Sequence, residues 1–327
     1  MKKLFLFVLL FSSSLALAKI NPQTVDAFIK STASNNNLDE QSIRLIINQA
    51  KRQQSIIDAM NKPAEKSKQW FEYRAIFLKD KRIKQGVEFW DTHQKTLEAV
   101  NKASGVPIEI IVAIIGVETY YGGNKGSYRV IDALYTLAFD YPRRAKFFTK
   151  ELEKFLVLVT KEKISALETK GSYAGAMGFG QFMPSSYLMY ALDYDKDGQR
   201  DLLNNIPDAI ASVANYLKVH GWKKDQGIAY LATARADFKK LNKQKLKPAF
   251  TVKQLNAMGY STKQKLADDA MVTLTQLQQK DYQEYWFGMH NFYIITRYNH
   301  SEMYAMAVYQ LAQEIKKMRE SRIRLRN

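Results

Sequence analysis

A nearly uninterrupted apolar segment, residues 108–117, constrains the fold of this 327-residue chain more than any other feature. Apart from Glu109 and Gly116, the segment contains only isoleucine, valine and alanine. A helix that is apolar on every side has to be surrounded by other elements, because none of its faces gains from contact with water. The segment therefore predicts a buried helix at the centre of a core that the rest of the chain builds around it.

The segments before and after this helix are mostly of the amphipathic helical type. Apolar residues recur three or four positions apart in residues 20–62 and 301–319, which is the period of one helix face. Residues 223–290 differ, because lysine-rich stretches alternate there with short runs typical of strands, such as 272–275 and 285–287. We therefore expect a mostly α (α+β) protein with a small β-containing insert near its C-terminal end.

The first residues have the features of a signal peptide. Lys2 and Lys3 precede a short apolar run, residues 4–11, and the Ala-Leu-Ala run at 16–18 supplies the small residues that a signal peptidase recognises. We expect cleavage near Lys19 and export to the periplasm, and an uncleaved N-terminal anchor is the alternative. The chain contains no cysteine, which excludes disulfides, thiol catalysis and the acylated cysteine of a lipoprotein.

The charge of the chain narrows the class of partner. It contains 49 lysine and arginine residues against 32 acidic residues, which gives a formal net charge of +17. Such a field attracts polyanions and anionic surfaces. Peptidoglycan, with its lactyl and peptide carboxylates, is the polyanion that an exported protein meets first. A nucleic-acid binder is an alternative that rests on net charge alone, and both export and the lack of a binding motif argue against it.

Glu118 is the first candidate for chemistry. It follows the apolar segment directly and precedes an aromatic corner closed by glycines, Tyr120-Tyr121-Gly122-Gly123. A carboxylic acid at the end of a buried helix is partly desolvated, which favours its protonated form near neutral pH. That form is the one a general acid needs in order to protonate a glycosidic oxygen. The alternative is a structural glutamate that caps local backbone groups or pairs with an arginine.

Two further stretches combine backbone freedom with polar side chains. Glycine and alanine are concentrated in residues 171–180, so the backbone there can approach a ligand closely, while Ser172 and Gln181 could hydrogen-bond to sugars. A tightly packed turn between helices is the alternative. The second stretch, Arg297 to Ser301, opens the last helix, and either Asn299 or Ser301 could simply be its N-cap.

These motifs together resemble a known family. The run Gly116 to Gly122 resembles the catalytic motif of the membrane-bound lytic murein transglycosylase B family. Residues 174–185 and 298–301 resemble that family's other two motifs, in the same order along the chain. The resemblance extends over roughly residues 68–312 and rests on long motifs, which makes it far more specific than a single short pattern.

The resemblance implies the fold, the activity and the residues of the site. The expected fold is a lysozyme-like core with an added helical lobe and a small β unit, and Glu118 is the expected catalytic acid. Residues at the positions that line the family's sugar cleft are Tyr73, Ser172, Gln181, Tyr216, Tyr298, Asn299 and Tyr304. Arg143 and Arg144 would face anionic peptide or lactyl groups, although both also suit an ordinary charged surface.

The expected organisation divides the chain into consecutive segments. They are a signal peptide (1–18), an N-terminal helical region (19–65), the lysozyme-like core with its helical lobe (66–222), the β-containing insert (223–290) and a C-terminal return to the core (291–327). We assign no function to the N-terminal helical region.

Only one carboxylate in the sequence stands out as catalytic. Most glycosidases use two, at a separation that sets the stereochemistry of the product. Glu109 lies too far along the same helix to share a bond with Glu118, and Asp132 and Asp140 belong to no motif. The resemblance implies that the substrate supplies the second group: its N-acetyl carbonyl stabilises positive charge and its own C6 hydroxyl attacks the anomeric carbon. The product would be a 1,6-anhydromuramic end, formed without water.

An acidic loop indicates a structural calcium site. Residues 193–201 carry aspartates at loop positions 1, 3, 5 and 9 and a glycine at position 6, an alternation that suits Ca²⁺. The loop departs from a standard EF-hand at position 12, which is Asn204, and in the resembling family a later aspartate matching Asp208 supplies that ligand. The expected ligands are Asp193, Asp195, Asp197, Gln199 and Asp208. The alternatives are a solvated acidic turn and, for Asp208, an N-cap.

The sequence leaves two other functions open besides a lytic transglycosylase. One is a non-catalytic peptidoglycan-binding module of the same fold, and the other is a lysozyme-type hydrolase that leaves reducing ends. The expected partners are peptidoglycan glycan strands and cell-wall synthesis proteins, for a monomer without a membrane anchor and without nucleic acid.

Overall fold

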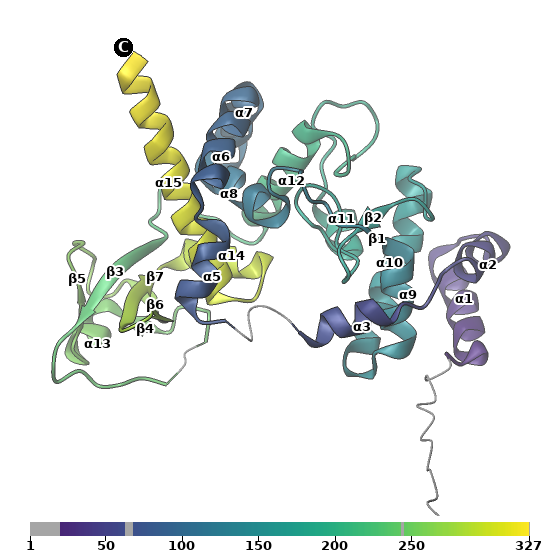
Figure 1. Cartoon of the computed structure of the whole chain (residues 1–327), viewed down its shortest axis with the longest axis horizontal. Helices are drawn as coiled ribbons and strands as arrows, with labels where there is room; N and C mark the ends of the chain where they lie inside the picture. The colour runs from purple at the N-terminus through teal and green to yellow at the C-terminus, as the bar shows by residue number, and fades with distance from the viewer. Residues whose placement is uncertain (1–19, 63–67, 243–244, 327) are drawn as a thin grey trace, which may run out of the picture.

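The computed structural model describes residues 20–62, 68–242 and 245–326, so the predicted signal peptide, residues 1–18, lies outside the described residues. The described chain forms three neighbouring regions: a helical core around α8 (Ile108–Thr119), a helical lobe, and a small β-sheet region (Figure 1). The prediction of a mostly helical protein with a small β-containing insert is therefore confirmed.

Helix α8 lies at the centre of the core, as its composition predicted. Its residues from Ile110 to Gly116 are all buried. The helices that pack against it are α6 (Asp80–Thr92), α7 (Gln94–Ser104), α12 (Ile206–Val219) and α15 (Glu302–Arg326). Helices α5 (Trp70–Phe77) and α14 (His290–Tyr298) contact α15 in turn. Because burial stabilises each large apolar side chain by roughly 1.5–3 kcal/mol, this helix holds together segments that are far apart in the sequence.

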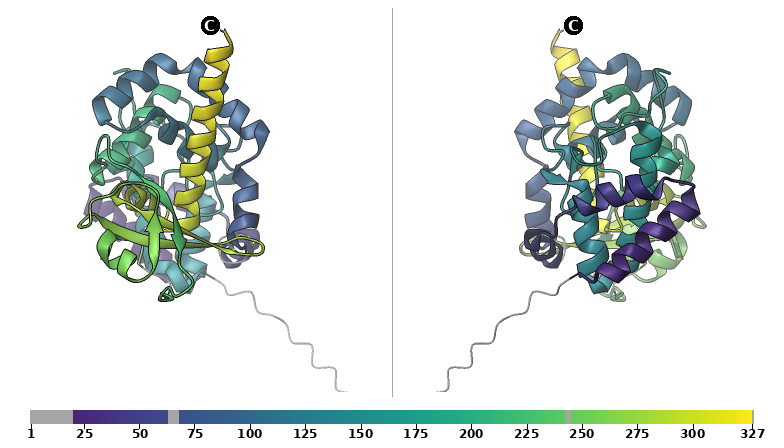
Figure 2. Two further views of the ribbon diagram at one scale, coloured as in Figure 1. Left: turned by 90° about the vertical axis from the view of Figure 1, so that its left-hand side faces the viewer. Right: turned by 90° about the vertical axis from the view of Figure 1, so that its right-hand side faces the viewer.

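The helical lobe is built on two long helices, α9 (Val130–Asp140) and α10 (Ala145–Glu162), which the 3₁₀ turn η1 (Pro142–Arg144) connects. Its other elements are α1 (Pro22–Asn36), α2 (Glu40–Asn48), α3 (Gln54–Asn61), α11 (Pro184–Tyr190) and the paired strands β1 (Tyr128–Arg129) and β2 (Lys170–Gly171). Helices α1 and α2 lie side by side on its outer face (Figure 2). The segment before α3 is fixed to α9, because the Lys51 N–H donates to the Asp132 carboxylate at 2.8 Å.

The β-sheet region lies between α12 and α14 in the sequence. Its strands are β3 (Ala229–Ala234), β4 (Phe250–Thr251), β5 (Tyr260–Thr262), β6 (Met271–Gln278) and β7 (Gln283–Gly288), with α13 (Val252–Ala257) beside them. The strands pair antiparallel in the order β4-β6-β7-β3-β5, and the predicted strand runs 272–275 and 285–287 lie in β6 and β7. Strand β7 leads into α14, and the last sequence motif, residues 298–301, begins where α14 ends.

The described helices also bear on the question of a membrane span. Among them no single helix is long and apolar enough to cross a membrane, and only the pair α7 and α8, bent by 114°, reaches that length and composition together. Helix α8 is buried in the core, which accounts for its apolar composition. The C-terminal end of α15 projects beyond the rest of the molecule (Figures 1 and 2).

Candidate active site

The catalytic candidate Glu118 lies in the last turn of α8, where the chain turns sharply. Helix α8 ends at Thr119, and the next two residues, Tyr120 and Tyr121, have φ angles of 55° and 60°. Both are in the left-handed region, which bulky side chains adopt at a cost of about 1–3 kcal/mol each. A pair of such residues persists only where the surrounding structure holds it in place.

Tyr121 is held between two helices by close packing against glycine. A Cβ atom built on Gly86 of α6 or on Gly116 of α8 would lie 2.5 or 2.6 Å from the Tyr121 hydroxyl oxygen. Only glycine leaves room for this ring at both positions. The hydroxyl donates to the Arg82 carbonyl at 3.0 Å, so the corner after Glu118 is bonded to α6. The backbone direction at Glu118 is therefore fixed by the packing of α6 against α8.

Tyr304 brings a second helix to Glu118. Its hydroxyl donates a hydrogen bond to Glu118 Oε1 at 2.6 Å, and the side chain is 2% exposed. Burial, together with the charge of Glu118, raises the pKa of Tyr304 well above its usual value of 10. The phenol consequently keeps its proton at any physiological pH and acts as a donor to the carboxyl group.

A group of tyrosines from different helices surrounds this pair. The ring of Tyr298 stacks on that of Tyr304, with centroids 6.4 Å apart and planes 6° from parallel, and its hydroxyl donates to the Gly180 carbonyl at 2.6 Å. Tyr216 meets Tyr298 edge-on at 4.7 Å, and burial raises the pKa of Tyr216 to about 12. Tyr73 of α5 also contributes to the raised pKa of Tyr304, which places these two phenols near each other.

Four helices, α5, α12, α14 and α15, each contribute one tyrosine to this group. The sequence resemblance implied that all four tyrosines line the sugar cleft. The glycine-rich stretch joins them through the bond from Tyr298 to Gly180. Aromatic rings with hydroxyl groups suit sugars, which present both apolar faces and hydroxyl edges.

The predicted sugar-binding residues of the glycine-rich stretch are also engaged within the loop itself. Ser172 Oγ accepts from the Ala176 N–H at 3.1 Å, and Gln181 Nε2 donates to the Gly178 carbonyl at 3.0 Å. These bonds hold the stretch in a tightly packed turn, as the alternative interpretation expected. Thr119 Oγ1 donates to the Phe179 carbonyl at 2.9 Å, which ties the stretch to the end of α8.

The remaining candidates of the sequence motifs lie on η1 and at the start of α15. Arg143 and Arg144 are exposed on η1, and the guanidinium of Arg144 lies 4.4 Å from the centroid of the Phe147 ring. Ser301 Oγ accepts from the Tyr304 N–H at 3.2 Å, so Ser301 is the N-cap of α15, the role that the sequence left open between it and Asn299.

The acidic loop brings three of its aspartates together. One carboxylate oxygen from each of Asp193, Asp195 and Asp197 lies within 4.8 Å of the others. Three like charges at this separation repel one another, and hard oxygen donors at this spacing are the donor set that Ca²⁺ takes. The residues of the loop therefore fit a calcium ion. Gln199 is exposed beside them, and its N–H donates to Asp197 at 2.8 Å.

Asp208 holds the two ends of this loop together. Its side chain is fully buried and accepts from the Tyr194 N–H at 2.7 Å and from the Asp201 N–H at 2.8 Å. Burial raises the pKa of Asp208. The alternative that Asp208 is an N-cap is wrong, because α12 begins two residues earlier and its N-cap is Asn205, whose side chain accepts from the Asp208 N–H.

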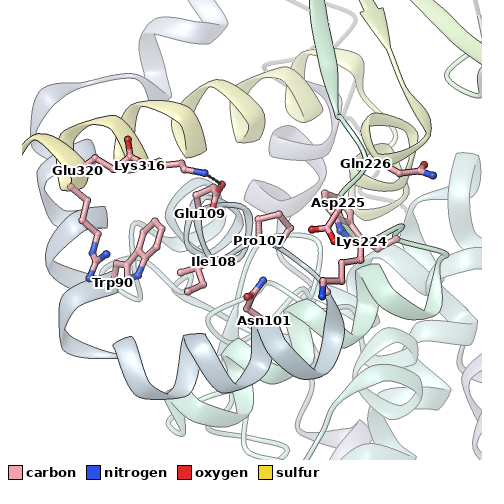
Figure 3. Close-up of a pocket in the computed structure, with 13 residues that line it drawn as sticks. Trp90, Asn101, Pro107, Ile108, Glu109, Lys224, Asp225, Gln226, Lys316 and Glu320 are labelled. Carbon is pink, nitrogen blue, oxygen red and sulfur yellow. Dashed lines mark hydrogen bonds and ion pairs between the residues drawn. The ribbon is translucent and has the colours of Figure 1, made fainter. Parts of the chain in front are cut away.

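A separate cavity of about 410 Å³ opens at the other end of α8 (Figure 3). Glu109 and Lys316, which both line it, point toward one another and form an ion pair at 3.1 Å (Figure 3). Its lining contains none of the residues predicted for sugar binding or catalysis. Glu109 is paired with a lysine and the lining contains no tyrosine, so the cavity lacks the chemistry of the Glu118 site.

Sequence reasoning missed the residues that position Glu118. The sequence places Tyr121 only in an aromatic corner, and Gly86 and Arg82 belong to none of the motifs. Their role depends on the approach of α6 to α8, which no local pattern reveals. The only local signal was the pair of aromatic residues between Glu118 and the following glycines.

Comparison with known proteins places these features in one family. The sequence profile of the transglycosylase SLT domain family matches residues 21–313. The membrane-bound lytic murein transglycosylase B of Escherichia coli (strain K12) is 41% identical over 304 residues, which cover 90% of this chain and 83% of that protein.

Two solved structures add to the comparison. The E. coli lytic transglycosylase Slt35 in complex with calcium aligns with a TM-score of 0.84 and 42% identity, covering 91% of this chain and 94% of that one. The structure of SltB3 from Pseudomonas aeruginosa in complex with NAG-NAM-pentapeptide aligns with a TM-score of 0.78 and 29% identity, covering 90% of this chain and 79% of that one.

Proposed function

This chain belongs to the transglycosylase SLT domain family, and we propose that it is a peptidoglycan lytic transglycosylase with Glu118 as its acid. The observation that carries the proposal is the hydrogen bond from Tyr304 to Glu118 at the end of a buried helix, inside a group of tyrosines. The site combines one carboxyl group that can exchange a proton with aromatic surfaces that can hold sugar rings.

The reaction needs one acid that later serves as base. Glu118 protonates the oxygen that links N-acetylmuramic acid to N-acetylglucosamine, and the bond from that oxygen to the anomeric carbon breaks. The N-acetyl carbonyl of the muramic residue stabilises the positive charge on that carbon. The C6 hydroxyl of the same residue then attacks it, and Glu118 takes the hydroxyl proton. Every atom of the substrate stays in the two products. The C6 hydroxyl replaces water as the nucleophile, and its attack is favoured by the large effective molarity of an intramolecular reaction.

The other two aspartates considered as catalytic carboxylates, Asp132 and Asp140, are both paired with arginines. Asp132 is paired with Arg129 at 2.6 Å and also receives the Lys51 N–H. Asp140 is paired with Arg52 at 2.6 Å. Both serve to join the N-terminal helical region to α9, so the substrate's own C6 hydroxyl is the nucleophile in this proposal.

The other predicted residues bind and orient the glycan strand. The rings of Tyr73, Tyr216 and Tyr298 supply apolar faces near Glu118, and Ser172, Gln181 and Asn299 supply hydrogen-bonding groups. Arg143 and Arg144 are exposed on η1, where they can attract the carboxylates of the strand without entering the reaction.

We further propose that the acidic loop binds calcium in a structural role, with Asp193, Asp195 and Asp197 as carboxylate ligands and with Gln199 and Asp208 completing the site. The close approach of the three carboxylates supports this proposal. A bound Ca²⁺ would supply only positive charge to the loop, since the loop takes no part in the proton transfers at Glu118.

The proposed activity also requires that the protein reach the cell wall. The predicted signal peptide, residues 1–18, would export it, and a chain without cysteine has no residue for lipoprotein acylation. We therefore propose a periplasmic protein without a lipid anchor, which acts on glycan strands as a monomer. Fractionation of cells that express the full chain tests this: recovery with washed membranes instead of the soluble periplasm would contradict it.

The nature of the product ends tests the activity directly. Purified sacculi are digested with the mature protein in water enriched in ¹⁸O, and the soluble products are analysed by mass spectrometry. We expect 1,6-anhydromuropeptides without ¹⁸O from the wild-type protein and no products from Glu118→Gln. Reducing ends that contain ¹⁸O would instead identify a lysozyme-type hydrolase, and binding to sacculi without any product would identify a non-catalytic module.

A further inference from the structure

Arg82 of α6 has an unusual environment next to the Glu118 corner. Its guanidinium carbon lies 4.6 Å from the centroid of the Tyr120 ring and 5.1 Å from that of the Phe77 ring. Contacts of a cation with two aromatic faces are favourable, by about 0.5–2 kcal/mol each, and they hold the guanidinium plane in a defined position. The group is therefore fixed in place although it belongs to a long, flexible side chain.

This guanidinium has no acceptor among the described residues. Its Nε and Nη1 atoms are buried without a hydrogen-bond partner, and burial lowers the pKa of Arg82. Arginine nevertheless remains charged at neutral pH. The side-chain oxygen of Gln85, one turn further along α6, is buried without a donor as well, so the two side chains do not satisfy each other. A charge that is partly removed from water and has no counter-ion is costly, which suggests that the partner of Arg82 is not part of the chain.

Several other half-buried arginines in the described residues do have carboxylate partners. Arg129 pairs with Asp132 at 2.6 Å and Arg319 pairs with Asp91 at 2.8 Å. Arg319 is a matched comparison, because its guanidinium also lies over an aromatic ring, that of Trp90, at 4.8 Å. The chain thus supplies a carboxylate to a ring-stacked arginine elsewhere and supplies none to Arg82.

The position of Arg82 places it on the reacting side of the molecule. Tyr120, which covers its guanidinium, follows Glu118 by two residues, and Tyr121 is bonded to the Arg82 carbonyl. The Phe77 ring on its other side lies 5.1 Å from the ring of Tyr73, a predicted cleft residue. Helices α6 and α8 lie side by side (Figure 1). Arg82 is therefore close to the end of α8 that carries Glu118.

We propose that Arg82 is a substrate-binding residue that takes a carboxylate of the glycan strand, an inference that rests on the proposed function. The tyrosines around Glu118 are neutral, whereas the strand carries carboxylates on its peptides and, where a peptide has been removed, on the lactyl group of muramic acid. A guanidinium recognises a carboxylate through two parallel N–H···O bonds, which fix orientation as well as position. Arg82 would thereby set the register of the strand relative to Glu118.

The experiment measures strand binding apart from turnover. Dissociation constants are measured for Glu118→Gln and for the double variant Arg82→Gln/Glu118→Gln. Lys81→Gln in the same background is the control, because Lys81 is exposed on the same helix and its change removes the same charge. The ligands are soluble strands that carry peptides and strands whose peptides have been removed, each before and after amidation of their carboxylates.

We expect Arg82→Gln to weaken binding about tenfold, which corresponds to about 1.4 kcal/mol, and Lys81→Gln to leave it within about twofold. Amidation should weaken binding to Glu118→Gln by at least the same factor. Its effect on the double variant should be about tenfold smaller, because the interaction with Arg82 is already lost there while Arg143 and Arg144 can still attract carboxylates. An effect confined to peptide-bearing strands identifies the peptide carboxylates as the partner, and one confined to peptide-free strands identifies the lactyl group.

The proposal would be overturned if amidation and Arg82→Gln weakened binding independently of each other. It would also be overturned if Arg82→Gln weakened binding to amidated strands as much as to unmodified strands. If Arg82→Gln does not fold, amidation still tests the protein with Arg82 intact, and an unchanged affinity there is equally decisive. Failure of the proposed function looks different: the wild-type protein would form no anhydro ends from any strand, whatever the dissociation constants.

Discussion

The two ends of helix α8 each carry a glutamate, and the two glutamates have different surroundings. Glu109, in the first turn, forms an ion pair with Lys316 of α15 at 3.1 Å. Glu118, in the last turn, accepts a hydrogen bond from the hydroxyl of Tyr304, also on α15, at 2.6 Å. The same pair of helices therefore presents a cation at one end and a neutral phenol at the other.

A cation and a phenol act differently on a carboxyl group. An ammonium group favours the ionised carboxylate, because protonation would remove the charge with which it pairs. A phenol that keeps its own proton orients the carboxyl group without adding a positive charge. A group held in this way can carry a proton to the substrate and take one back within a single reaction. The partner, and not the residue type, thus distinguishes a structural glutamate from a catalytic one.

Exchanging each glutamate for glutamine in turn tests whether the two differ in their role in the reaction. Glu118→Gln should lower the rate of anhydromuropeptide formation by about 1,000-fold or more, because the amide cannot donate a proton as an acid. Glu109→Gln should keep the rate within about twofold, since its side chain lies about 13 Å along the helix from Glu118. Initial rates on purified sacculi measure both. Comparable losses in the two variants would show that α8 as a whole, and not its C-terminal end, is needed.

Removal of the Tyr304 hydroxyl tests what the phenol contributes to the role of Glu118. Tyr304→Phe should lower kcat by roughly tenfold or more, because a hydrogen bond to a charged group contributes about 1.5–3 kcal/mol. The lost donor stabilised the ionised carboxyl, so the acid should hold its proton to higher pH and the alkaline limb of the pH–rate profile should move upward. Since the pKa of Tyr304 lies well above 10, the phenol itself adds no limb below that pH. An unshifted profile would mean that Tyr304 acts on the substrate and not on Glu118.

The central part of this arrangement could be predicted from the sequence. The composition of residues 108–117 predicted a buried helix, and burial of its residues confirms it, because a helix without a polar face has only one stable environment. The strand runs 272–275 and 285–287 were recognised for a similar reason, since β-branched and aromatic residues pack well in sheets. In both cases the information lies within a few consecutive residues.

The partners across the fold could not be predicted in the same way. The bond from Tyr304 to Glu118 joins residues 186 positions apart, and it depends on how α15 crosses α8. Local patterns also leave the start of a helix ambiguous. Asp208 is an acceptable cap residue for α12, but Asn205, within one turn of it, is the N-cap. Arg82 gave no signal, since its lack of a partner is a property of its surroundings.

The acidic loop extends the comparison to carboxylates whose neighbours are other carboxylates. Calcium at about 100 times its dissociation constant should stabilise the protein by about 2.7 kcal/mol, and its removal by a chelator should lower the Tm by about 5 °C. Asp195→Asn should abolish this shift, whereas Asp269→Asn, at an exposed aspartate of the β-sheet region, should preserve it. Thermal unfolding with and without calcium measures the effect. A Tm that does not respond to calcium would assign the loop to a solvated acidic turn.

The ion pair between Glu109 and Lys316, at the other end of α8, should contribute little to the free energy of unfolding. The Glu109 side chain is 12% exposed but its partner Lys316 is 46% exposed, so solvent screens the pair and it should contribute no more than about 1 kcal/mol. Glu109 also lies in the first turn of α8, where a negative charge interacts favourably with the helix dipole. Glu109→Gln should therefore lower the Tm by at most about 2 °C, and Lys316→Met should make most of that loss redundant. If the two changes instead lower the Tm by the full sum of their separate effects, Glu109 does not interact with Lys316 and is stabilised by the helix end alone. The lysine would then not be the partner that distinguishes Glu109 from Glu118.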